Sequence, residues 1–275
     1  MSPSFTPVTV LGTGPRAAAL AATLGEHAPR ERDRAPGTSS PLVVCVDDYD
    51  TAARILADTE LASRDVVNLT SGTGPQAQDL ADLVTGRGGR YLDGALMGYP
   101  EHVGNPDTVL VYSGSPELFQ RREALLTRLG TATYLGPDPA TAALYDLSML
   151  GFAWATLLGY LHSAALLRTA GVSATKTAPL LNHWMSTTVT AVIADYAGQI
   201  DEGRYPGDAE WLELDAPLMD HLVDTAEARG VDSELPRLIR SLTYRGIDAG
   251  FGGNSFANLI EHLAPWSSAN NARRE

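Results

Sequence analysis

A glycine-rich turn near the start of the chain has the residue types that bind phosphate. A short apolar strand, Val8–Leu11, is followed by the turn Gly12-Thr13-Gly14 and by an alanine-rich helix that runs to about Gly25. A strand, a G-x-G turn and a helix form the phosphate-binding start of a dinucleotide fold, because the helix N-terminus attracts a pyrophosphate. The turn therefore predicts a dinucleotide site, although a strand-to-helix turn without a ligand has the same pattern.

The segment that should complete this dinucleotide unit is missing. A second strand would end in a residue that binds the adenosine ribose. Instead, Glu26–Ser40 contains two prolines, no apolar run and five charged residues between Arg30 and Arg34. This composition predicts a loop, and the next strand, Leu42–Val46, follows directly. The arginines of the loop, which include Arg32, could bind a 2′-phosphate or could simply be solvated.

Apolar runs and helical patterns alternate through the rest of the first half. Such alternation implies a parallel sheet covered on both faces, in which ligands bind at the carboxyl ends of the strands. The predicted strands are Val8–Leu11, Leu42–Val46, Asp65–Leu69, Arg90–Asp93, Thr108–Ser113 and Thr131–Leu135, and the predicted helices between them include Thr51–Thr59, Gln76–Gly86 and Pro116–Leu129. Four groups would then share one edge of the sheet: Gly12–Gly14, Cys45–Asp47, Asn68–Thr70 and Gly94–Gly98.

One long helix is predicted over Ala140–Arg168, which is nearly all apolar and contains no proline. A helix that is apolar all round must be buried all round. Its length also suits a membrane span, but Asp146, His162 and the absence of a polybasic flank favour a helix that links two domains and packs inside a dimer. The predicted domains are a degenerate Rossmann domain (1–139), the interdomain helix (140–170) and a helical dimerisation and substrate domain (171–275).

Composition excludes several classes of protein. The 275 residues are 44% hydrophobic and 19% charged, which suits two globular domains. A net charge of −13 argues against nucleic acid as a partner, because phosphate contacts need a basic face. The single cysteine, Cys45, forms no disulfide within the chain, and none of the six histidines has the spacing of a metal site. Since the N-terminus has no signal-peptide pattern, we expect a cytoplasmic protein without membrane or metal partners.

Six phrases occur in order along the chain: VTVLGTGP, LVVCVDDYD, VVNLTSGT, YLDGALMGYPEHVGNPDTVLVYSG, LYDLSMLG and GDAEWLELDAPLMDHLV. Together they resemble the NADPH-dependent imine reductases of the β-hydroxyacid dehydrogenase and 6-phosphogluconate dehydrogenase-like superfamily. The resemblance implies an α/β fold, with a truncated Rossmann parallel sheet followed by a long interdomain helix and an all-α C-terminal domain. It also implies a domain-swapped homodimer, with the active site between one subunit's Rossmann domain and the other's helical domain.

When residues of this chain are matched to the family's positions, they define a candidate cofactor site. The site applies only if the chain has retained a cofactor. Gly12 and Gly14 match the phosphate-binding glycines, and Asn68 and Thr70 match the loop that lines the nicotinamide. The candidate cofactor residues are Gly12, Thr13, Gly14, Pro15, Arg16, Cys45, Val46, Asn68 and Thr70. The family's element that reads the 2′-phosphate has no counterpart here. Losing two or three charge-assisted hydrogen bonds of roughly 1.5–3 kcal/mol each would weaken binding about a thousandfold. We therefore expect no cofactor, or a weakly bound NADPH.

The candidate catalytic residues are Asp146, Trp154 and Asp215. Asp146 falls where the family often has a polar residue facing the cleft, and Trp154 falls at the family's proton-donor position. An indole N–H does not give up a proton, but Trp154 could stack on a cation, and Asp146 or Asp215 could exchange protons if burial raises the pKa. The alternatives are a packing role for Trp154 and a structural hydrogen bond for Asp146. The candidate substrate pocket is Met97, Tyr99, Trp184 and Met219.

The missing adenosine element and the changed proton donor together favour a repurposed scaffold. The leading hypothesis is an imine-reductase-like biosynthetic enzyme that acts on a small imine, iminium or amine substrate by a cofactor-independent, non-redox step, such as cyclisation, dehydration or isomerisation. The first alternative is an NADPH-dependent imine reductase with a modified adenosine pocket. The second alternative is a non-catalytic binding protein on the same scaffold.

Overall fold

The computed structural model describes residues 8–24 and 40–263, so the predicted loop with Arg30, Arg32 and Arg34 lies outside the described residues. The chain divides into two compact units, residues 1–153 and 154–275, and the division falls inside one long helix. The described residues of the first unit form a sheet with covering helices, and those of the second unit are helical.

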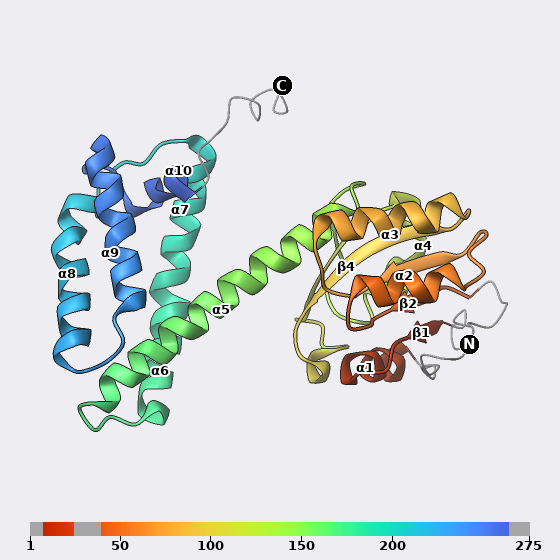
Figure 1. The fold of residues 1–275 in the computed structure, drawn as a ribbon, viewed down its shortest axis with the longest axis horizontal. Coiled ribbons are helices and arrows are strands. Elements are labelled where there is room, and N and C mark those ends of the chain that lie inside the picture. The colour runs from red at the N-terminus through yellow and green to blue at the C-terminus, as the bar shows by residue number, and fades with distance from the viewer. Residues whose placement is uncertain (1–7, 25–39, 264–275) are drawn as a thin grey trace. The chain divides into compact units, whose positions relative to one another are not determined.

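Six strands of the first unit form one sheet in the order β1-β2-β3-β4-β5-β6 (Figure 1). Their bounds are β1 Thr9–Leu11, β2 Leu42–Val44, β3 Asp65–Asn68, β4 Arg90–Met97, β5 Val109–Gly114 and β6 Thr133–Tyr134. The first four strands pair in parallel, with Leu11 beside Val44 and Asn68 beside Asp93. The predicted α/β fold with a Rossmann-like parallel sheet is therefore confirmed.

The truncation is visible at β1, which lies at the end of the strand order and pairs directly with β2. In a complete dinucleotide-binding sheet the first strand is central, and strands on its other side carry the residue that binds the adenosine ribose. In the part of the chain that the structure describes, no such strands separate β2 from the helix after β1, α1 (Pro15–Leu24). The described sheet thus lacks the adenosine half of the fold.

Two strands, β5 and β6, depart from the predicted direction. β5 runs antiparallel to β4, and β6 then runs parallel to β5. Two parallel neighbours need a crossover of about a dozen residues or more, which usually contains a helix. The connection from Met97 to Val109 contains only the short 3₁₀ turn η1 (Pro100–His102), so the chain reverses direction instead.

Four helices cover the two faces of the sheet. α1 and α4 (Pro116–Leu126) bury apolar side chains such as Leu20 against one face. α2 (Tyr49–Ala57) and α3 (Gly74–Gly86) bury side chains such as Leu80 against the other face, and both lie on the same side of the sheet in Figure 1. The first unit is therefore a three-layer sandwich with a core on each face of the sheet.

Local capping places the starts of these helices directly after the strands. Asp48 Oδ1 accepts a hydrogen bond from the backbone N–H of Thr51 at 2.7 Å, so α2 begins at Tyr49 rather than at the predicted Thr51. Ser115 Oγ accepts one from the N–H of Leu118 at 3.2 Å at the start of α4. Each such cap contributes about 1 kcal/mol. The N-terminus of α2 therefore lies at the edge where ligands of such sheets bind. The N-terminus of α4 lies at the opposite edge, because Gly114 at the end of the antiparallel β5 pairs with Leu92 near the start of β4.

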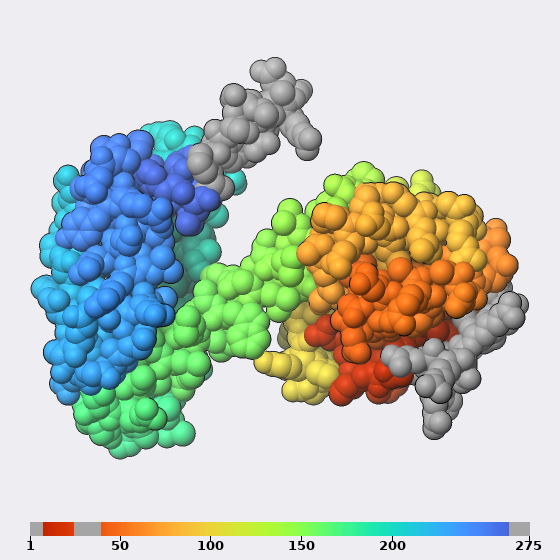
Figure 2. All heavy atoms as spheres, viewed as in Figure 1, coloured from red at the N-terminus to blue at the C-terminus, as the bar shows by residue number. Residues whose placement is uncertain are grey.

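The long helix α5 spans Ala140–Arg168, the predicted bounds. Of its residues, only Ala142, Ala143 and Asp146 are buried. Large apolar side chains are exposed along it, with Trp154 at 65%, and part of this stretch is visible in green at the surface in Figure 2. By length and composition alone, α5 could also span a membrane. Core helices of soluble proteins meet the same two criteria. The apolar surface of α5 is therefore uncovered within the described chain.

The second unit is helical, as predicted. After α5 its helices are α6 (Ala174–Trp184), α7 (Thr190–Glu202), α8 (Leu212–Ala228), α9 (Glu234–Gly246) and α10 (Ile260–Leu263). A π-helical turn (Met185–Val189) joins α6 to α7, and another (Ile247–Phe251) follows α9. α8 and α9 pack side by side (Figure 1), and across them the Tyr244 hydroxyl donates to Asp220 Oδ2 at 2.8 Å.

Candidate active site

The phosphate-binding turn is shaped by its first glycine. Gly12 has a φ of +154°, and a Cβ there would overlap the Cys45 carbonyl oxygen. At Gly14, by contrast, a Cβ would meet none of the described atoms within 4 Å. Gly14 directly precedes Pro15, the first residue of α1, and Thr13 between the two glycines is exposed. An open backbone beside a helix N-terminus fits the pyrophosphate of a dinucleotide.

Hydrogen bonds join the segments that follow the strands. The backbone N–H of Val46, after β2, donates to Thr70 Oγ1, after β3, at 3.2 Å. Arg16 Nη2, in the first turn of α1, donates to the Gly98 carbonyl oxygen, after β4, at 3.5 Å. Burial raises the pKa of the Cys45 thiol to about 11, so this thiol stays neutral and is a packing group. The structure thus brings the candidate cofactor residues of the first unit to one edge of the sheet.

Asp146 lies at the same edge, in the second turn of α5, and is only 4% exposed. The Ser71 hydroxyl hydrogen-bonds its carboxyl group, and the Arg16 guanidinium lies near it. Burial outweighs both of these groups and raises the pKa of Asp146. A buried carboxyl group with a raised pKa, placed where ligands of such sheets bind, has the chemistry of a proton donor.

A second buried carboxyl group, Asp93, was missed by the sequence reasoning. Asp93 Oδ1 accepts three hydrogen bonds, from the Tyr91 hydroxyl at 2.7 Å, the Tyr49 hydroxyl at 2.8 Å and Asn68 Nδ2 at 2.9 Å. Burial, with a smaller contribution from the charge of Asp146, raises the pKa of Asp93 to about 6 despite these donors. The signal in the sequence was a lone aspartate inside the apolar strand β4.

Asn68 belongs to this buried network. Its side chain is fully buried, and its amide Oδ1 accepts a hydrogen bond from the backbone N–H of Thr70 at 3.2 Å. Both polar groups of the Asn68 amide are therefore engaged inside the protein. Its role in the structure is to order the loop after β3, which carries Ser71, the hydrogen-bond partner of Asp146.

Two candidate pocket residues lie at the end of β4. Met97 is the last residue of that strand and is half-buried. Tyr99 is 62% exposed and its ring lies near that of His102, whose Nδ1 accepts a hydrogen bond from the Tyr99 backbone N–H at 3.1 Å. These two exposed rings lie directly after the end of β4, the end of the strand that faces the edge with Arg16 and Asp146.

The remaining candidates lie in the second unit. Trp154 is exposed on α5, Trp184 is exposed at the end of α6, and Met219 is half-buried on α8. In the part of the chain that the structure describes, no group of three or more His, Cys, Asp or Glu side chains could hold a metal ion.

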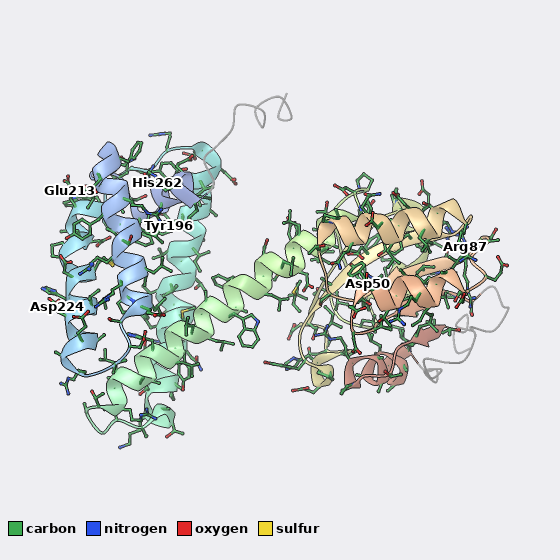
Figure 3. All side chains as sticks on the ribbon, viewed as in Figure 1. Asp50, Arg87, Tyr196, Glu213, Asp224 and His262 are labelled. Carbon is green, nitrogen blue, oxygen red and sulfur yellow. The ribbon has the colours of Figure 1, made fainter. Side chains whose placement is uncertain are left out.

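Asp215, in the first turn of α8, is paired with another carboxyl group. Burial, followed by a hydrogen bond with Glu210 and the charge of Glu210, raises the pKa of Asp215 to about 6. Glu210 also accepts hydrogen bonds from the Tyr196 hydroxyl at 2.7 Å and from the backbone N–H of Phe256 at 3.1 Å; Figure 3 labels Tyr196 on α7.

Comparison with known proteins gives consistent matches. Residues 138–265 match the family model of the NADPH-dependent reductive aminase-like C-terminal domain. An NADPH-dependent reductive aminase of Aspergillus oryzae is 35% identical over 228 residues, which cover 81% of this chain and 77% of that protein.

Several solved structures have a similar fold over nearly the whole chain. A reductive aminase from Aspergillus terreus in complex with NADPH and ethyl levulinate is 30% identical, with 94% of this chain and 100% of that chain covered and a TM-score of 0.85. A further structure of a reductive aminase from Aspergillus terreus contains NADPH4, cyclohexanone and allyl amine. An imine reductase from Myxococcus stipitatus in complex with NADP+ is 27% identical, with 94% and 100% covered and a TM-score of 0.84.

These complexes correct the cofactor prediction. The expectation of no cofactor, or of a weakly bound NADPH, is wrong, because structures similar over 94% of the chain hold NADPH or NADP+. The prediction gave too much weight to the missing adenosine segment. It gave too little to the pyrophosphate half of the site, which the Gly12–Gly14 turn and the N-terminus of α1 retain.

Proposed function

This chain belongs to the family of NADPH-dependent imine reductases and reductive aminases, and from that premise we propose that it reduces imines to amines with NADPH. The substrates would be small imines, including those formed from a ketone and a primary amine. The single observation in the structure that carries the proposal is Asp146, a buried carboxyl group with a raised pKa, near Arg16 of the first turn after the phosphate-binding glycines.

The residues present fit the pyrophosphate part of the cofactor. Gly14 leaves open space beside its backbone, and the N-terminus of α1 follows it directly. The N–H groups of a helix N-terminus and its positive dipole end favour bound phosphate. Thr70, held by the Val46 N–H, lies after β3 on the same edge. We propose that these residues hold the cofactor, with the nicotinamide toward Asp146.

The reaction needs a hydride for the imine carbon and a proton for the imine nitrogen, and it yields an amine and NADP+. When bound, NADPH supplies the hydride from C4 of its nicotinamide. Asp146 donates the proton to nitrogen, and its raised pKa keeps that proton available closer to neutral pH than an ordinary aspartate would. The exposed Tyr99 and the half-buried Met97 would line the substrate side of this edge.

The leading hypothesis from the sequence was a cofactor-independent, non-redox step, and the similar proteins named above do not support it. The similar proteins are reductive aminases and imine reductases, and several were solved with NADPH or NADP+. They favour the first alternative, an NADPH-dependent imine reductase with a modified adenosine pocket. The described residues agree with that alternative, since the adenosine half of the sheet is missing while the pyrophosphate turn is complete.

The direct test is oxidation of NADPH by the purified full-length protein. We expect the absorbance of NADPH to fall when cyclohexanone and allylamine are added together, and an amine to form in equal amount by mass spectrometry. Neither the ketone nor the amine alone should support the reaction. Amine formation without consumption of NADPH, or no turnover of this pair and of a panel of preformed cyclic imines, would refute the proposed function.

We also propose that two copies of the chain pair through α5 into a homodimer. The support is the exposed apolar surface of α5, which includes Leu144, Trp154 and Leu161, each more than 60% exposed. An apolar surface of this extent marks an interaction site. Light scattering in detergent-free buffer should give twice the chain mass of 29.2 kDa. Leu161→Glu should shift the protein toward monomers, and a wild-type monomer or a protein soluble only in detergent would contradict the dimer.

A further inference from the structure

The loop directly after β3, residues 69–73, carries two groups of the candidate site, and we call it the β3 loop. Thr70 Oγ1 accepts a hydrogen bond from the backbone N–H of Val46 at 3.2 Å. Ser71 is the hydrogen-bond partner of Asp146. The side chains that hold the β3 loop in place therefore help to set the shape of the site.

Asn68 holds the start of the β3 loop from inside the core. Its amide Oδ1 accepts from the backbone N–H of Thr70 at 3.2 Å, and its Nδ2 donates to Asp93 Oδ1 at 2.9 Å. Asn68 and Asp93 are opposite each other on the neighbouring strands β3 and β4, so their side chains point to the same face of the sheet. Because one amide makes both hydrogen bonds, the orientation that serves Asp93 also serves Thr70.

Tyr49 connects Asp93 to the other half of the β3 loop. Its hydroxyl donates to the same oxygen, Asp93 Oδ1, at 2.8 Å. Its ring packs against Gly72 so closely that a Cβ at Gly72 would overlap the ring. The φ of Gly72 is not positive, so the ring and not the backbone conformation requires a glycine there. Two side chains that are hydrogen-bonded to Asp93 thus contact the β3 loop at separate points.

The carboxylate of Asp93 fixes which of its neighbours donate. With a pKa of about 6, Asp93 is ionised at neutral pH, and an ionised carboxylate can only accept. The Tyr91 hydroxyl is a third donor, at 2.7 Å. Asn68 must therefore turn its NH₂ group toward Asp93, which leaves its amide oxygen facing the N–H of Thr70. An asparagine at position 93 would not impose this orientation, since an amide both donates and accepts.

We propose that Asp93 is a positioning residue for the cofactor: through Asn68 and Tyr49 it holds the β3 loop in the conformation in which Thr70 binds NADPH. This inference rests on the proposed function, in which Thr70 helps to hold the cofactor. Asp93 is only 1% exposed, so it acts through these neighbours and not by contact with NADPH.

Asp93→Asn tests the proposal because it keeps the size of the side chain and adds a donor. In one orientation the new NH₂ group replaces Oδ2, which is buried and has no hydrogen-bond partner among the described residues. In the other orientation it faces the NH₂ group of Asn68. We expect the N–H of Thr70 to exchange with deuterium about tenfold faster in the cofactor-free variant, and the Kd for NADPH to rise about tenfold. Unchanged exchange and an unchanged Kd would overturn the proposal.

Exchanging the two side chains tests whether Asp93 acts through Asn68. The double variant Asn68→Asp with Asp93→Asn again contains one carboxylate and one amide, and its carboxylate can accept from the N–H of Thr70. We expect both the exchange rate of Thr70 and the Kd for NADPH to return to within about threefold of the wild type. A double variant that is as impaired as Asp93→Asn would show that Asp93 does not act through Asn68.

Asp65→Asn is the matched control, because it makes the same change at the opposite end of β3. Asp65 is buried, and its Oδ1 and Oδ2 accept from Arg90 Nε at 2.5 Å and Arg122 Nε at 2.8 Å. Its replacement should lower the free energy of unfolding without changing the exchange of Thr70 or the Kd for NADPH. Equally faster exchange of Thr70 in Asp65→Asn and Asp93→Asn would show general loosening of the first unit and would contradict the proposal.

The exchange measurement separates this proposal from the proposed function, because it needs neither cofactor nor substrate. Faster exchange of Thr70 in Asp93→Asn, in a protein that reduces no imine, would support the hold of Asp93 on the β3 loop and refute the function. Unchanged exchange in a variant of an active enzyme would refute the positioning role alone.

Discussion

Replacing Asp146 with asparagine is expected to lower kcat/KM for imine reduction by about 10²–10⁴-fold, the usual contribution of a positioned general acid. Asparagine keeps the shape and can bond Ser71, but it has no proton to transfer at neutral pH. The hydride step would then depend on protonation by water. Steady-state rates with cyclohexanone and allylamine, taken at saturating NADPH across the pH range, measure the loss.

The control for this prediction is cofactor affinity. NADPH quenching of tryptophan fluorescence should give a Kd within about threefold of the wild type, because Asp146 lies beyond the phosphate-binding turn. Ser71→Ala is the matched variant: it removes a hydrogen bond that favours ionised Asp146, so the alkaline limb of the pH profile should move to higher pH. If Asp146→Asn keeps rates within threefold of the wild type, Asp146 is not the proton donor.

Alanine substitutions at the two glycines of the turn are expected to weaken NADPH binding in both cases, but only the one at Gly12 is expected to destabilise the fold. Gly12→Ala places a methyl group onto the Cys45 carbonyl oxygen at a φ of +154°, which is strained for any L-residue. We expect a loss of stability of about 2–3 kcal/mol or more, measured by urea unfolding, together with loss of NADPH binding because the turn must shift.

Gly14→Ala is the matched control, since its Cβ meets none of the described atoms within 4 Å. The fold should keep its stability to within about 1 kcal/mol. NADPH binding should weaken by about 10- to 100-fold, because the methyl group occupies the space through which the pyrophosphate reaches the backbone. Unchanged NADPH affinity in Gly14→Ala would show that the cofactor does not bind at this turn.

Much of the fold was predictable because its signals are local. The apolar run LVV and the proline-free stretch Ala140–Arg168 gave β2 and the bounds of α5. The start of α2 differed by two residues because the Asp48 cap outweighed the hydrophobic pattern. The direction of β5 was not predictable from its own residues, since it depends on whether the preceding connection can form a crossover.

The candidate site was predictable only in part. The phosphate turn has a sequence signature, and Asp146 drew attention as a carboxyl group in an apolar helix. Asn68 was expected to line the nicotinamide, but its amide is engaged with Asp93 and with the backbone of Thr70. Asp93 was missed, because one aspartate in a strand reveals nothing of the tyrosines that reach it from other elements.

The sequence by itself therefore determined the family, the order of helices and strands, and the turn that fits a pyrophosphate. Only the tertiary structure decided which carboxyl groups are buried and have a raised pKa. The pKa of Asp146 depends on its burial and on groups from α1 and the loop after β3. These groups are separated by tens of residues along the chain, and charge interactions and desolvation act through distances in space.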